Sequence, residues 1–278
     1  MAAATVVDDV LGRPAEEADV PSGITWLLRD SWTEATRHLR AMPRSPELLM
    51  FATIQPVMFV LLFAYVFGGS IEVPGFDDYN QFLMPGIFAQ TVLFNSAFTG
   101  VGVAEDLSKG IIDRLRSLPM YPSAVLIGRT LSDVVRNVLT FAVMLVVAFA
   151  IGFRFEGTLA EAVLATLLLF LFSYAFSWVA ALIGLSAGSV EAANSAGFIW
   201  MFPLTFVSSA FVSPENMPAW LERVADANPF TIVTNACRAL YNGESAGNDP
   251  WIALAWAVGI TLVFATLAAR KFASTASR

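Results

Sequence analysis

The 278-residue chain has few of the side chains from which metal and catalytic sites are usually built. It contains one cysteine, Cys237, and one histidine, His38. A single cysteine excludes an intrachain disulfide and a cysteine-based metal site. A single histidine excludes a His-Glu-x-x-His zinc motif and, because His38 lies in a polar segment, a serine–histidine pair inside a membrane. We therefore expect no metal, no catalytic residues and no enzyme activity of the chain itself.

Lysine is also scarce, because Lys109 and Lys271 are the only two. The phosphate-binding loop of many ATPases needs Gly-x-x-x-x-Gly-Lys followed by Ser or Thr, and neither lysine lies in that context. The chain therefore does not bind ATP by this route. We expect no resident cofactor.

Charge is missing from long stretches of the chain. Charged residues make up 14% of it and hydrophobic residues 56%, too apolar for an ordinary globular core. Six stretches approach the roughly 20 residues that cross a bilayer. They predict an all-α membrane protein with six transmembrane helices at about 48–67, 82–103, 124–153, 162–187, 192–211 and 251–270. No predicted span carries a charge at its centre, which argues against a proton-coupled pump or a voltage-gated channel.

Lys and Arg predict the orientation of these spans. With the N-terminus inside, 13 of the 16 Lys and Arg residues lie on the cytoplasmic side, and only Arg154, Arg223 and Arg238 lie outside. Both termini are therefore predicted to be cytoplasmic. The acidic segment 1–21 lacks the pattern of a signal peptide, and we expect it to be a flexible cytoplasmic tail before a membrane domain at 22–278.

Residues 24–42 have the pattern of an amphipathic helix. Trp26 and Trp32 suit a helix that lies at the level of the lipid headgroups, although a soluble helix packed on another element has the same pattern. The predicted apolar side carries Ile24, Leu27, Leu28, Ser31, Ala35 and Leu39, and the opposite side carries Arg29, Asp30, Glu34, Arg37 and Arg40.

Residues 105–118 form a second short amphipathic element, predicted on the cytoplasmic side. Glu105 and Asp106 suit the first turn of a helix, where negative charge stabilises the helix dipole. A simple connector would explain the segment, but a stripe of apolar residues opposite a mixed-charge face also suits contact with a partner protein. The apolar stripe is Leu107, Ile111, Ile112, Leu115 and Leu118, and the polar face holds Lys109, Asp113 and Arg116.

Residues 212–248 are predicted outside and are interrupted by Pro214, Pro218 and Pro229. Two short helical patterns, at 217–227 and 230–241, are too short to cross a bilayer and too apolar for free loops. Re-entrant helices that dip into the outer leaflet fit this segment best.

Two sequence runs resemble a known family. They are Glu105-Asp-Leu-Ser-Lys-Gly-Ile-Ile-Asp-Arg-Leu-Arg-Ser-Leu-Pro and Ser209-Ala-Phe-Val-Ser-Pro-Glu-Asn-Met-Pro-Ala-Trp-Leu. Both are similar to segments of ABC type-2 permeases, in particular the daunorubicin-resistance (DrrB-like) group, in the same order and topology. The resemblance covers about residues 24–271, and the tail before Ser22 is not covered.

The resemblance implies the six-helix type V exporter fold in a bacterial plasma membrane. The implied partners are two ABC ATPase chains that bind ATP and Mg, a second permease half (identical or related) and membrane lipids, with no nucleic acid. Residues 24–42 would be the connecting helix and 105–118 the coupling helix seated in the ATPase. The residues expected to meet the ATPase are Glu105, Lys109, Asp113, Arg114 and Arg116.

The implied substrate is hydrophobic or amphipathic: a drug, an antibiotic, a lipid or a glycolipid. If the two halves meet along the second and fifth spans, an export path lies between them, lined by aromatic and small polar side chains. Packing against lipid or protein is the alternative explanation for each of these side chains. The candidates for the path are Phe88, Asn95, Phe98, Thr99, Asn194, Phe198, Phe202, Thr205 and Phe206.

Two other functions remain open on the sequence. One is a membrane interaction or assembly protein without transport, and the other is a channel. The amphipathic segment 105–118 favours an energised partner over the first. The lack of polar or charged pore-lining residues in the spans disfavours the second.

Overall fold

The computed structural model describes residues 24–41, 46–67, 78–112 and 122–275. Within these ranges all regular structure is helical, and no strand is present. This confirms the predicted helical class. In chain order the elements are α2 (Ile24–Ala41), α3 (Pro46–Leu61), the π-helical turn η3 (Leu62–Phe67), α4 (Tyr79–Ser108), α6 (Pro122–Ala150), α7 (Leu159–Ser186), α8 (Val190–Ile199), α9 (Met201–Phe206), the 3-10 turn η4 (Pro214–Asn216), α10 (Ala219–Asp226), α11 (Pro229–Asn242) and α12 (Asp249–Thr275).

Four of these helices are long and apolar enough to cross a membrane. They cover Tyr79–Ser108, Ala124–Ala150, Leu159–Ser186 and Asp249–Phe272. A helix rises 1.5 Å per residue, so each spans the roughly 30 Å of a hydrocarbon core. They correspond to the second, third, fourth and sixth predicted spans.

The first and fifth predicted spans are irregular. The first is α3, which contains Pro56 and continues into η3. The fifth, predicted as one helix at 192–211, is instead two short helices, because α8 ends at Ile199 and α9 runs only from Met201 to Phe206. Pro203 explains the interruption: it has no N–H for the carbonyl four residues earlier, and its ring collides with that carbonyl. The prediction of a continuous fifth helix is wrong.

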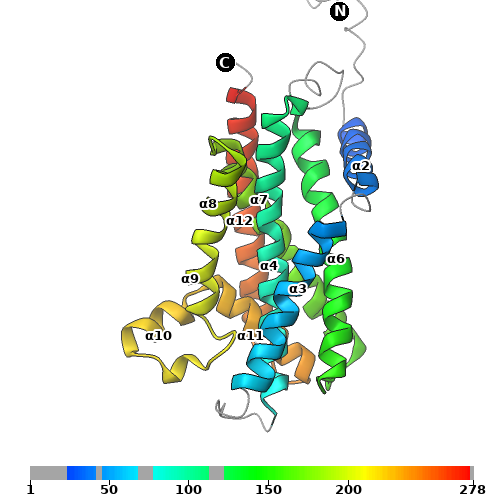
Figure 1. The fold of residues 1–278 in the computed structure, drawn as a ribbon. Helices are drawn as coiled ribbons and strands as arrows, with labels where there is room; N and C mark the ends of the chain where they lie inside the picture. Colours follow the sequence, from blue (N-terminus) through cyan, green and yellow to red (C-terminus); the bar gives the residue numbers. More distant parts are fainter. Residues whose placement is uncertain (1–23, 42–45, 68–77, 113–121, 276–278) are drawn as a thin grey trace, which may run out of the picture.

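Helix α4 lies at the centre of the bundle, with α7 along it (Figure 1). The two backbones come close where both helices have small residues. A β-carbon on Gly100 would overlap the carbonyl oxygen of Ala180, and one on Gly184 would overlap the carbonyl oxygen of Gly100. Glycine at these positions allows membrane helices to approach closely. The chain therefore fixes α4 against α7 by backbone contact.

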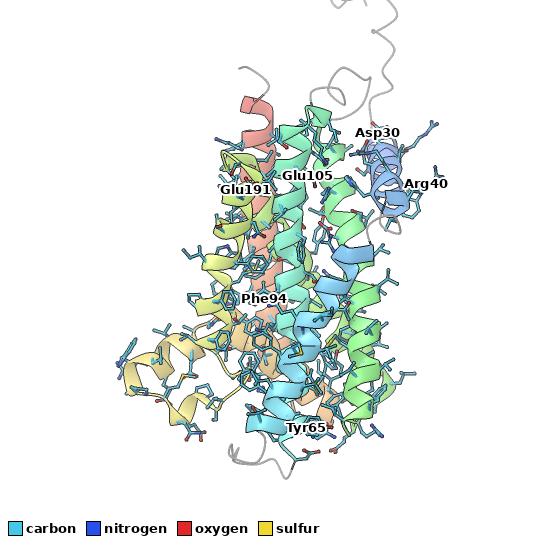
Figure 2. The ribbon with its side chains drawn as sticks, in the orientation of Figure 1. Asp30, Arg40, Tyr65, Phe94, Glu105 and Glu191 are labelled. Atoms are coloured by element: carbon cyan, nitrogen blue, oxygen red, sulfur yellow. The ribbon has the colours of Figure 1, made fainter. Side chains whose placement is uncertain are left out.

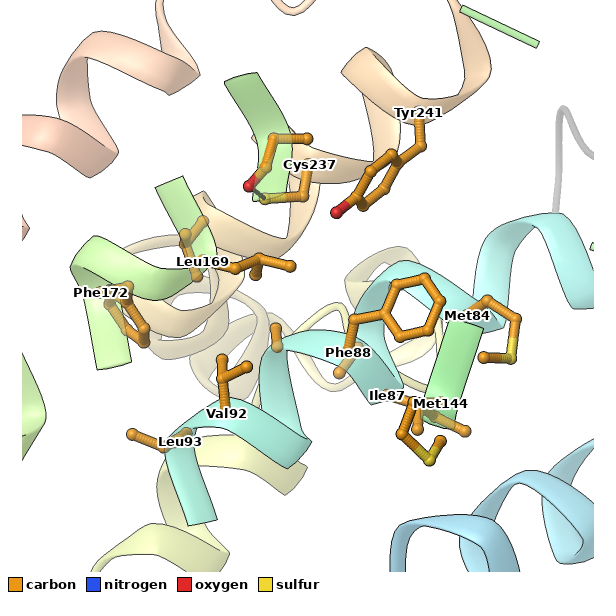
Figure 3. Close-up of a cluster of buried hydrophobic side chains, with 14 of the residues drawn as sticks. Met84, Ile87, Phe88, Val92, Leu93, Met144, Leu169, Phe172, Cys237 and Tyr241 are labelled. Carbon is orange, nitrogen blue, oxygen red and sulfur yellow. Dashed lines mark hydrogen bonds between the residues drawn. The ribbon is translucent and has the colours of Figure 1, made fainter. Parts of the chain in front are cut away.

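The hydrophobic core lies around the half of α4 that begins at Tyr79 (Figure 3). Phe88 is fully buried there, with its ring edge-on to Phe141, Phe153 and Tyr241 at centroid distances of 5.0, 5.7 and 6.0 Å. Such edge-to-face pairs add to the stability that burial provides. Helix α11 contributes Tyr241 and Cys237 to this core and is therefore an integral part of the bundle.

Helix α12 has an inner and an outer side of different composition. Ala253, Ala257 and Ala268 are fully buried against the bundle, whereas Trp251 and Leu262 are 71% and 65% exposed. Contiguous apolar surface of this kind is rare on soluble monomers. The outer side is suited to contact with lipid.

The ends of the helices fall into two groups. Helix α2, the Ser108 end of α4 and the last turns of α12 lie at one end of the bundle, while α10 and the first turns of α12 lie at or near the other (Figure 1). Figure 2 places Glu105 and Glu191 at the first end and Tyr65 at the second, with Phe94 between them. Helices α10 and α11 occupy the segment predicted to be re-entrant. The predicted tail at 1–21 lies outside the described residues.

Candidate aromatic site and charge cluster

Phenylalanine rings from five helical elements and from Phe211 form a continuous series, here called the aromatic face. Phe94 lies 5.7 Å from Phe198 and 5.3 Å from Phe202, measured between ring centroids. At the other end Phe63 stacks on Phe211 at 4.6 Å. These distances are typical of attractive ring pairs. The aromatic face consists of Phe59 (α3), Phe63 (η3), Phe94 and Phe98 (α4), Phe198 (α8), Phe202 and Phe206 (α9) and Phe211.

The aromatic face is open on the side of α8 and α9. Phe202 and Phe206 are 42% and 43% exposed, and Ile199 beside them is 75% exposed. Phe94 lies beneath them and is buried. The arrangement is an apolar surface with a rigid base and accessible rings.

The structure brings four of the predicted substrate-path residues together on this face, namely Phe98, Phe198, Phe202 and Phe206.

Other predicted path residues lie elsewhere. Phe88 belongs to the core described above. The hydroxyl of Thr205 donates to the carbonyl of Met201 in its own helix, and the hydroxyl of Thr99 donates to the carboxylate of Asp133. Asn194 is exposed in the first half of α8, and Asn95 lines a pocket together with Phe94, Phe98 and Phe198 of the aromatic face.

A small cavity of about 20 Å³ lies between α3, α4 and α8. Gln90 and Asn95 line it, together with Phe94, Phe98 and Phe198 of the aromatic face. Asn95 was predicted as a path residue, whereas Gln90 was not. The available signal was a second uncharged amide in the same charge-free span.

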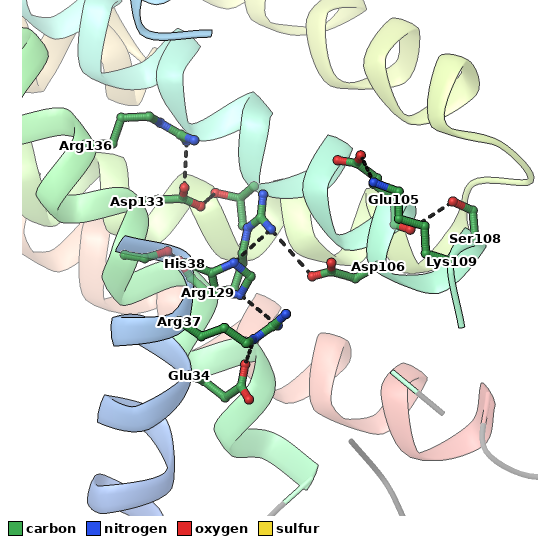
Figure 4. A network of polar contacts seen from close by, with 12 residues as sticks. Glu34, Arg37, His38, Glu105, Asp106, Ser108, Lys109, Arg129, Asp133 and Arg136 are labelled. Atoms are coloured by element: carbon green, nitrogen blue, oxygen red, sulfur yellow. Dashed lines mark hydrogen bonds and ion pairs between the residues drawn. The ribbon is translucent and has the colours of Figure 1, made fainter. Parts of the chain in front are cut away.

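A second group of residues, the charge cluster, joins the three helices α2, α4 and α6 (Figure 4). It consists of Glu34, Arg37 and His38 (α2), Asp106 (α4), and Arg129, Asp133 and Arg136 (α6). The α6 members recur at i, i+4 and i+7, so they share one side of that helix.

The buried part of the charge cluster is an ion pair between α6 residues. Arg136 Nη2 lies 2.7 Å from Asp133 Oδ1 and also donates to the carbonyl of Asn95 at 3.2 Å. The Arg136 guanidinium lies over the ring of Phe98, 5.4 Å from its centroid. Asp133 is 2% exposed and also accepts from Thr99. The pair therefore holds α6 to α4 and connects the charge cluster to the aromatic face.

Arg129 links α6 to the other two helices. Its Nη1 lies 3.5 Å from Asp106 Oδ2 and 3.4 Å from His38 Nδ1. On the other side of the imidazole, His38 Nε2 lies 3.3 Å from Arg37 Nη2. Burial, and then the charges of Arg129, Arg37 and Arg136, lower the pKa of His38 to about 3 from its usual 6.5. His38 is therefore neutral at physiological pH.

Helix α2 packs with part of its predicted apolar side and part of its predicted polar side. Ser31 and Ala35 of the predicted apolar side are buried. Glu34 was placed on the exposed polar side, but it is 4% exposed and paired with Arg37. Leu28, on the predicted apolar side, and Trp32, predicted to lie at the level of the lipid headgroups, are more than 60% exposed. The reason is at Gly128, where a β-carbon would overlap Glu34, so α6 accepts the polar edge of α2. The edge that carries Leu28 and Trp32 is left exposed.

The predicted coupling segment at 105–118 begins differently in the structure. Glu105 lies in the last turn of α4, paired with Lys109, and not in the first turn of a new helix. The chain turns at Lys109–Gly110, where Gly110 has a φ of 64°, and helical geometry resumes at Ile111. Asp113, Arg114 and Arg116 lie outside the described residues, so their contact with an ATPase stays a prediction.

Among the described residues no group of three or more His, Cys, Asp or Glu side chains could hold a metal ion. A bundle of long apolar helices with an apolar outer surface is a polytopic membrane protein.

Comparison with known proteins identifies the family. The family model described as ABC-2 type transporter matches residues 30–242. The chain is 34% identical over 260 residues to the daunorubicin resistance ABC transporter permease protein DrrB1 of Streptomyces coeruleorubidus, covering 94% of this chain and 89% of that protein. The chain therefore belongs to the ABC-2 type transporter family.

Two further relatives are more distant. The chain is 22% identical over 232 residues to the probable doxorubicin resistance ABC transporter permease protein DrrC of Mycobacterium tuberculosis, covering 84% of each chain. It is 28% identical over 187 residues to the probable multidrug ABC transporter permease YbhR of Escherichia coli, covering 64% of this chain and 48% of that protein. These matches favour the permease interpretation over a non-transporting assembly protein or a channel.

Proposed function

We propose that the chain is the membrane subunit of an ABC exporter that moves hydrophobic or amphipathic aromatic drugs out of the cytoplasm or the inner leaflet. A separate ATPase, which binds ATP and Mg, drives it. The aromatic face carries this proposal: it offers exposed rings over a rigid base in a family whose relatives are named for daunorubicin, doxorubicin and multidrug transport. Affinity there would come from buried apolar area and a few polar contacts.

Export can be tested in cells that express the chain together with its ATPase. We expect lower accumulation of radiolabelled daunorubicin than in cells with the ATPase alone. A variant ATPase that cannot hydrolyse ATP is the matched control and should abolish the difference. Equal accumulation in all three strains, for daunorubicin and a panel of other aromatic drugs, would contradict the proposal.

We further propose six crossings, with α3–η3 as the first and α8–α9 as a broken fifth. Helix α2 and the last turns of α12 lie at the same end of the bundle, which suits an even number of crossings with both termini in the cytoplasm. On this topology α10 and α11 form the outer re-entrant segment. Backbone broken within the membrane is acceptable in the fifth crossing if protein covers it, as a second permease half would.

Thiol labelling tests this topology. In a Cys237→Ser background, single cysteines at Asp78 or Glu215 should react with an impermeant thiol reagent added to intact cells. Cysteines at Ser108 or Glu191, both exposed in the structure at the opposite end, should react only after lysis. Labelling of the Ser108 position in intact cells would refute the proposed orientation.

We also propose that residues 105–118 seat in the ATPase, in a complex of two permease halves and two ATPase chains. The position of Glu105 at the end of the central helix α4 supports this, because a displacement there is transmitted to the centre of the bundle. Reversing the charges of both Asp113 and Arg116 should abolish substrate-stimulated ATP hydrolysis without affecting membrane insertion, since like charges at a buried contact cost several kcal/mol. Normal stimulation in that variant would place the contact elsewhere.

A further inference from the structure

Two buried side-chain amide nitrogens on α4 lack hydrogen-bond partners among the described residues. Gln90 and Asn95 are 4% and 3% exposed, and neither Gln90 Nε2 nor Asn95 Nδ2 has a partner among the described residues. Leaving such a donor unpaired is costly, and buried amides normally find an acceptor. Both side chains line the cavity of about 20 Å³ between α3, α4 and α8. An acceptor atom in this cavity would satisfy them.

The walls of the cavity limit what can enter it. Its volume corresponds to about one water-sized group. Phe94, Phe98 and Phe198 border it, so a flat ring attached to that group would lie against aromatic carbon. Gln55, on the α3 side, also lines the cavity and is exposed.

Charge further restricts the ligand. None of the described residues that line the cavity is charged. Arg136 lies over the Phe98 ring but is already paired with Asp133. A carboxylate or an ammonium group would therefore lose its hydration without gaining a counter-charge. An uncharged oxygen would gain hydrogen bonds from the amides.

We propose that this cavity is a subsite for a carbonyl or hydroxyl oxygen carried on an aromatic ring of the transported compound. Gln90 and Asn95 donate to the oxygen, and Phe94, Phe98 and Phe198 pack on the ring that bears it. The proposal rests on the proposed export function. It adds that, among the transported compounds, those with an oxygen on an aromatic ring bind more tightly. Ring systems without such an oxygen bind the aromatic face but leave the amides unpaired.

Binding of two matched probes to the purified permease in lipid nanodiscs tests the proposal. One probe is an anthraquinone with an alkylamine chain, and the other is the anthracene with the same chain. Sites built to hydrogen-bond a ligand discriminate against the analogue that lacks the group. We expect the wild type to bind the quinone roughly fivefold to tenfold more tightly, and the carbonyl stretch of the bound quinone to shift to lower frequency.

Two near-isosteric variants locate the effect. Gln90→Met and Asn95→Leu should each weaken binding of the quinone by about threefold to tenfold and leave binding of the anthracene unchanged. Ser96→Ala is the matched control, because Ser96 is buried on the same helix but its hydroxyl is satisfied by the carbonyl of Leu93. It should alter neither affinity.

Equal affinity of the wild type for both probes, or a bound quinone whose carbonyl frequency is unshifted, would overturn the proposal and leave the cavity to a structural water. These two measurements need no variant and remain decisive if a variant does not fold. Measuring export of both probes from cells distinguishes failure of the subsite from failure of the export function. If both are exported and the oxygen makes no difference, only the subsite fails; if wild type exports neither probe nor any other aromatic drug, the export function fails with it.

Discussion

The guanidinium group of Arg129 lies across Gly102 and fills the space that a side chain at position 102 would occupy. This contact brings Arg129 of α6 within reach of Asp106, one turn further along α4, and of His38 on α2. The absence of a side chain at one position of α4 thus allows three helices to share one cation. It also makes this contact between α2, α4 and α6 sensitive to the addition of a single methyl group.

Gly102→Ala should therefore destabilise the protein, because the added methyl group displaces Arg129 from Asp106 and His38. Overpacking of this kind typically costs about 1–3 kcal/mol. The free energy of unfolding in detergent measures it. Gly259→Ala on α12 is the matched control: apart from the neighbouring backbone of its own helix, no described atom lies within 4 Å of the added carbon, so it should be neutral or slightly stabilising. Equal stability of the two variants would mean that Arg129 moves aside without cost.

The Asp133–Arg136 pair predicts a difference between single and double replacement. Asp133→Asn leaves the Arg136 guanidinium buried without its counter-charge and should lower the free energy of unfolding by about 3–5 kcal/mol. Replacing both residues together, as Asp133→Leu with Arg136→Met, should cost less, because no buried charge remains. Chemical unfolding of the three proteins compares them. A double variant less stable than Asp133→Asn would show that the pair contributes net stability.

The lowered pKa of His38 predicts how stability depends on pH. The folded chain has a pKa of about 3 at this group against 6.5 when unfolded, so the unfolded chain binds one more proton between these values. The free energy of unfolding should therefore fall as pH decreases from about 6.5 towards 3 and be insensitive to this group above 6.5. Because His38 is the only histidine, its single imidazole NMR signal reports the titration directly.

That signal should not shift between pH 7 and pH 5. His38→Gln should remove this part of the pH dependence of unfolding. An imidazole midpoint near 6.5 in the folded protein would show that the side chain is hydrated and not held between the two arginines.

Phe88 and Phe202 were both predicted as substrate-path residues. The structure predicts that replacing them by alanine has different effects on stability and on drug recognition. Phe88→Ala removes a fully buried ring and should cost about 3–5 kcal/mol of stability. Phe202→Ala removes a ring that is 42% exposed and should change which drugs stimulate ATP hydrolysis by the complex while costing much less stability. Thermal unfolding and a drug panel on the same two variants check both expectations. An unchanged drug profile for Phe202→Ala would remove that residue from the path.

The long helices could be predicted because a charge-free run of about 20 residues has few alternatives to crossing a bilayer. The break between α8 and α9 could not be read from the mean hydropathy of the run, because that mean averages over Pro203 and its apolar neighbours. The proline itself was visible, and its missing N–H was the signal that should have been used.

The burial of Glu34 on α2 was missed for a different reason. The helical pattern groups Leu28 with the apolar residues and Glu34 with the polar ones, but Gly128 of α6 allows the polar edge to approach. Which residues of such a helix become buried is decided by contacts between segments that are distant in the sequence. The same holds for the cavity at Gln90 and Asn95, whose other walls come from α3 and α8, and for Phe88, whose partners come from three other segments.

The two-sided composition of α12 has a consequence for how freely this helix can vary. Its buried alanines, Ala253, Ala257 and Ala268, leave no room for a larger residue, whereas its outer positions need only be apolar. In a saturation scan of α12, tolerance to substitution should rise and fall with a period of 3.6 residues. Outer positions should accept any aliphatic or aromatic residue but not a charged residue at the middle of the helix. Inner positions should be more sensitive to a larger side chain than to a small polar one.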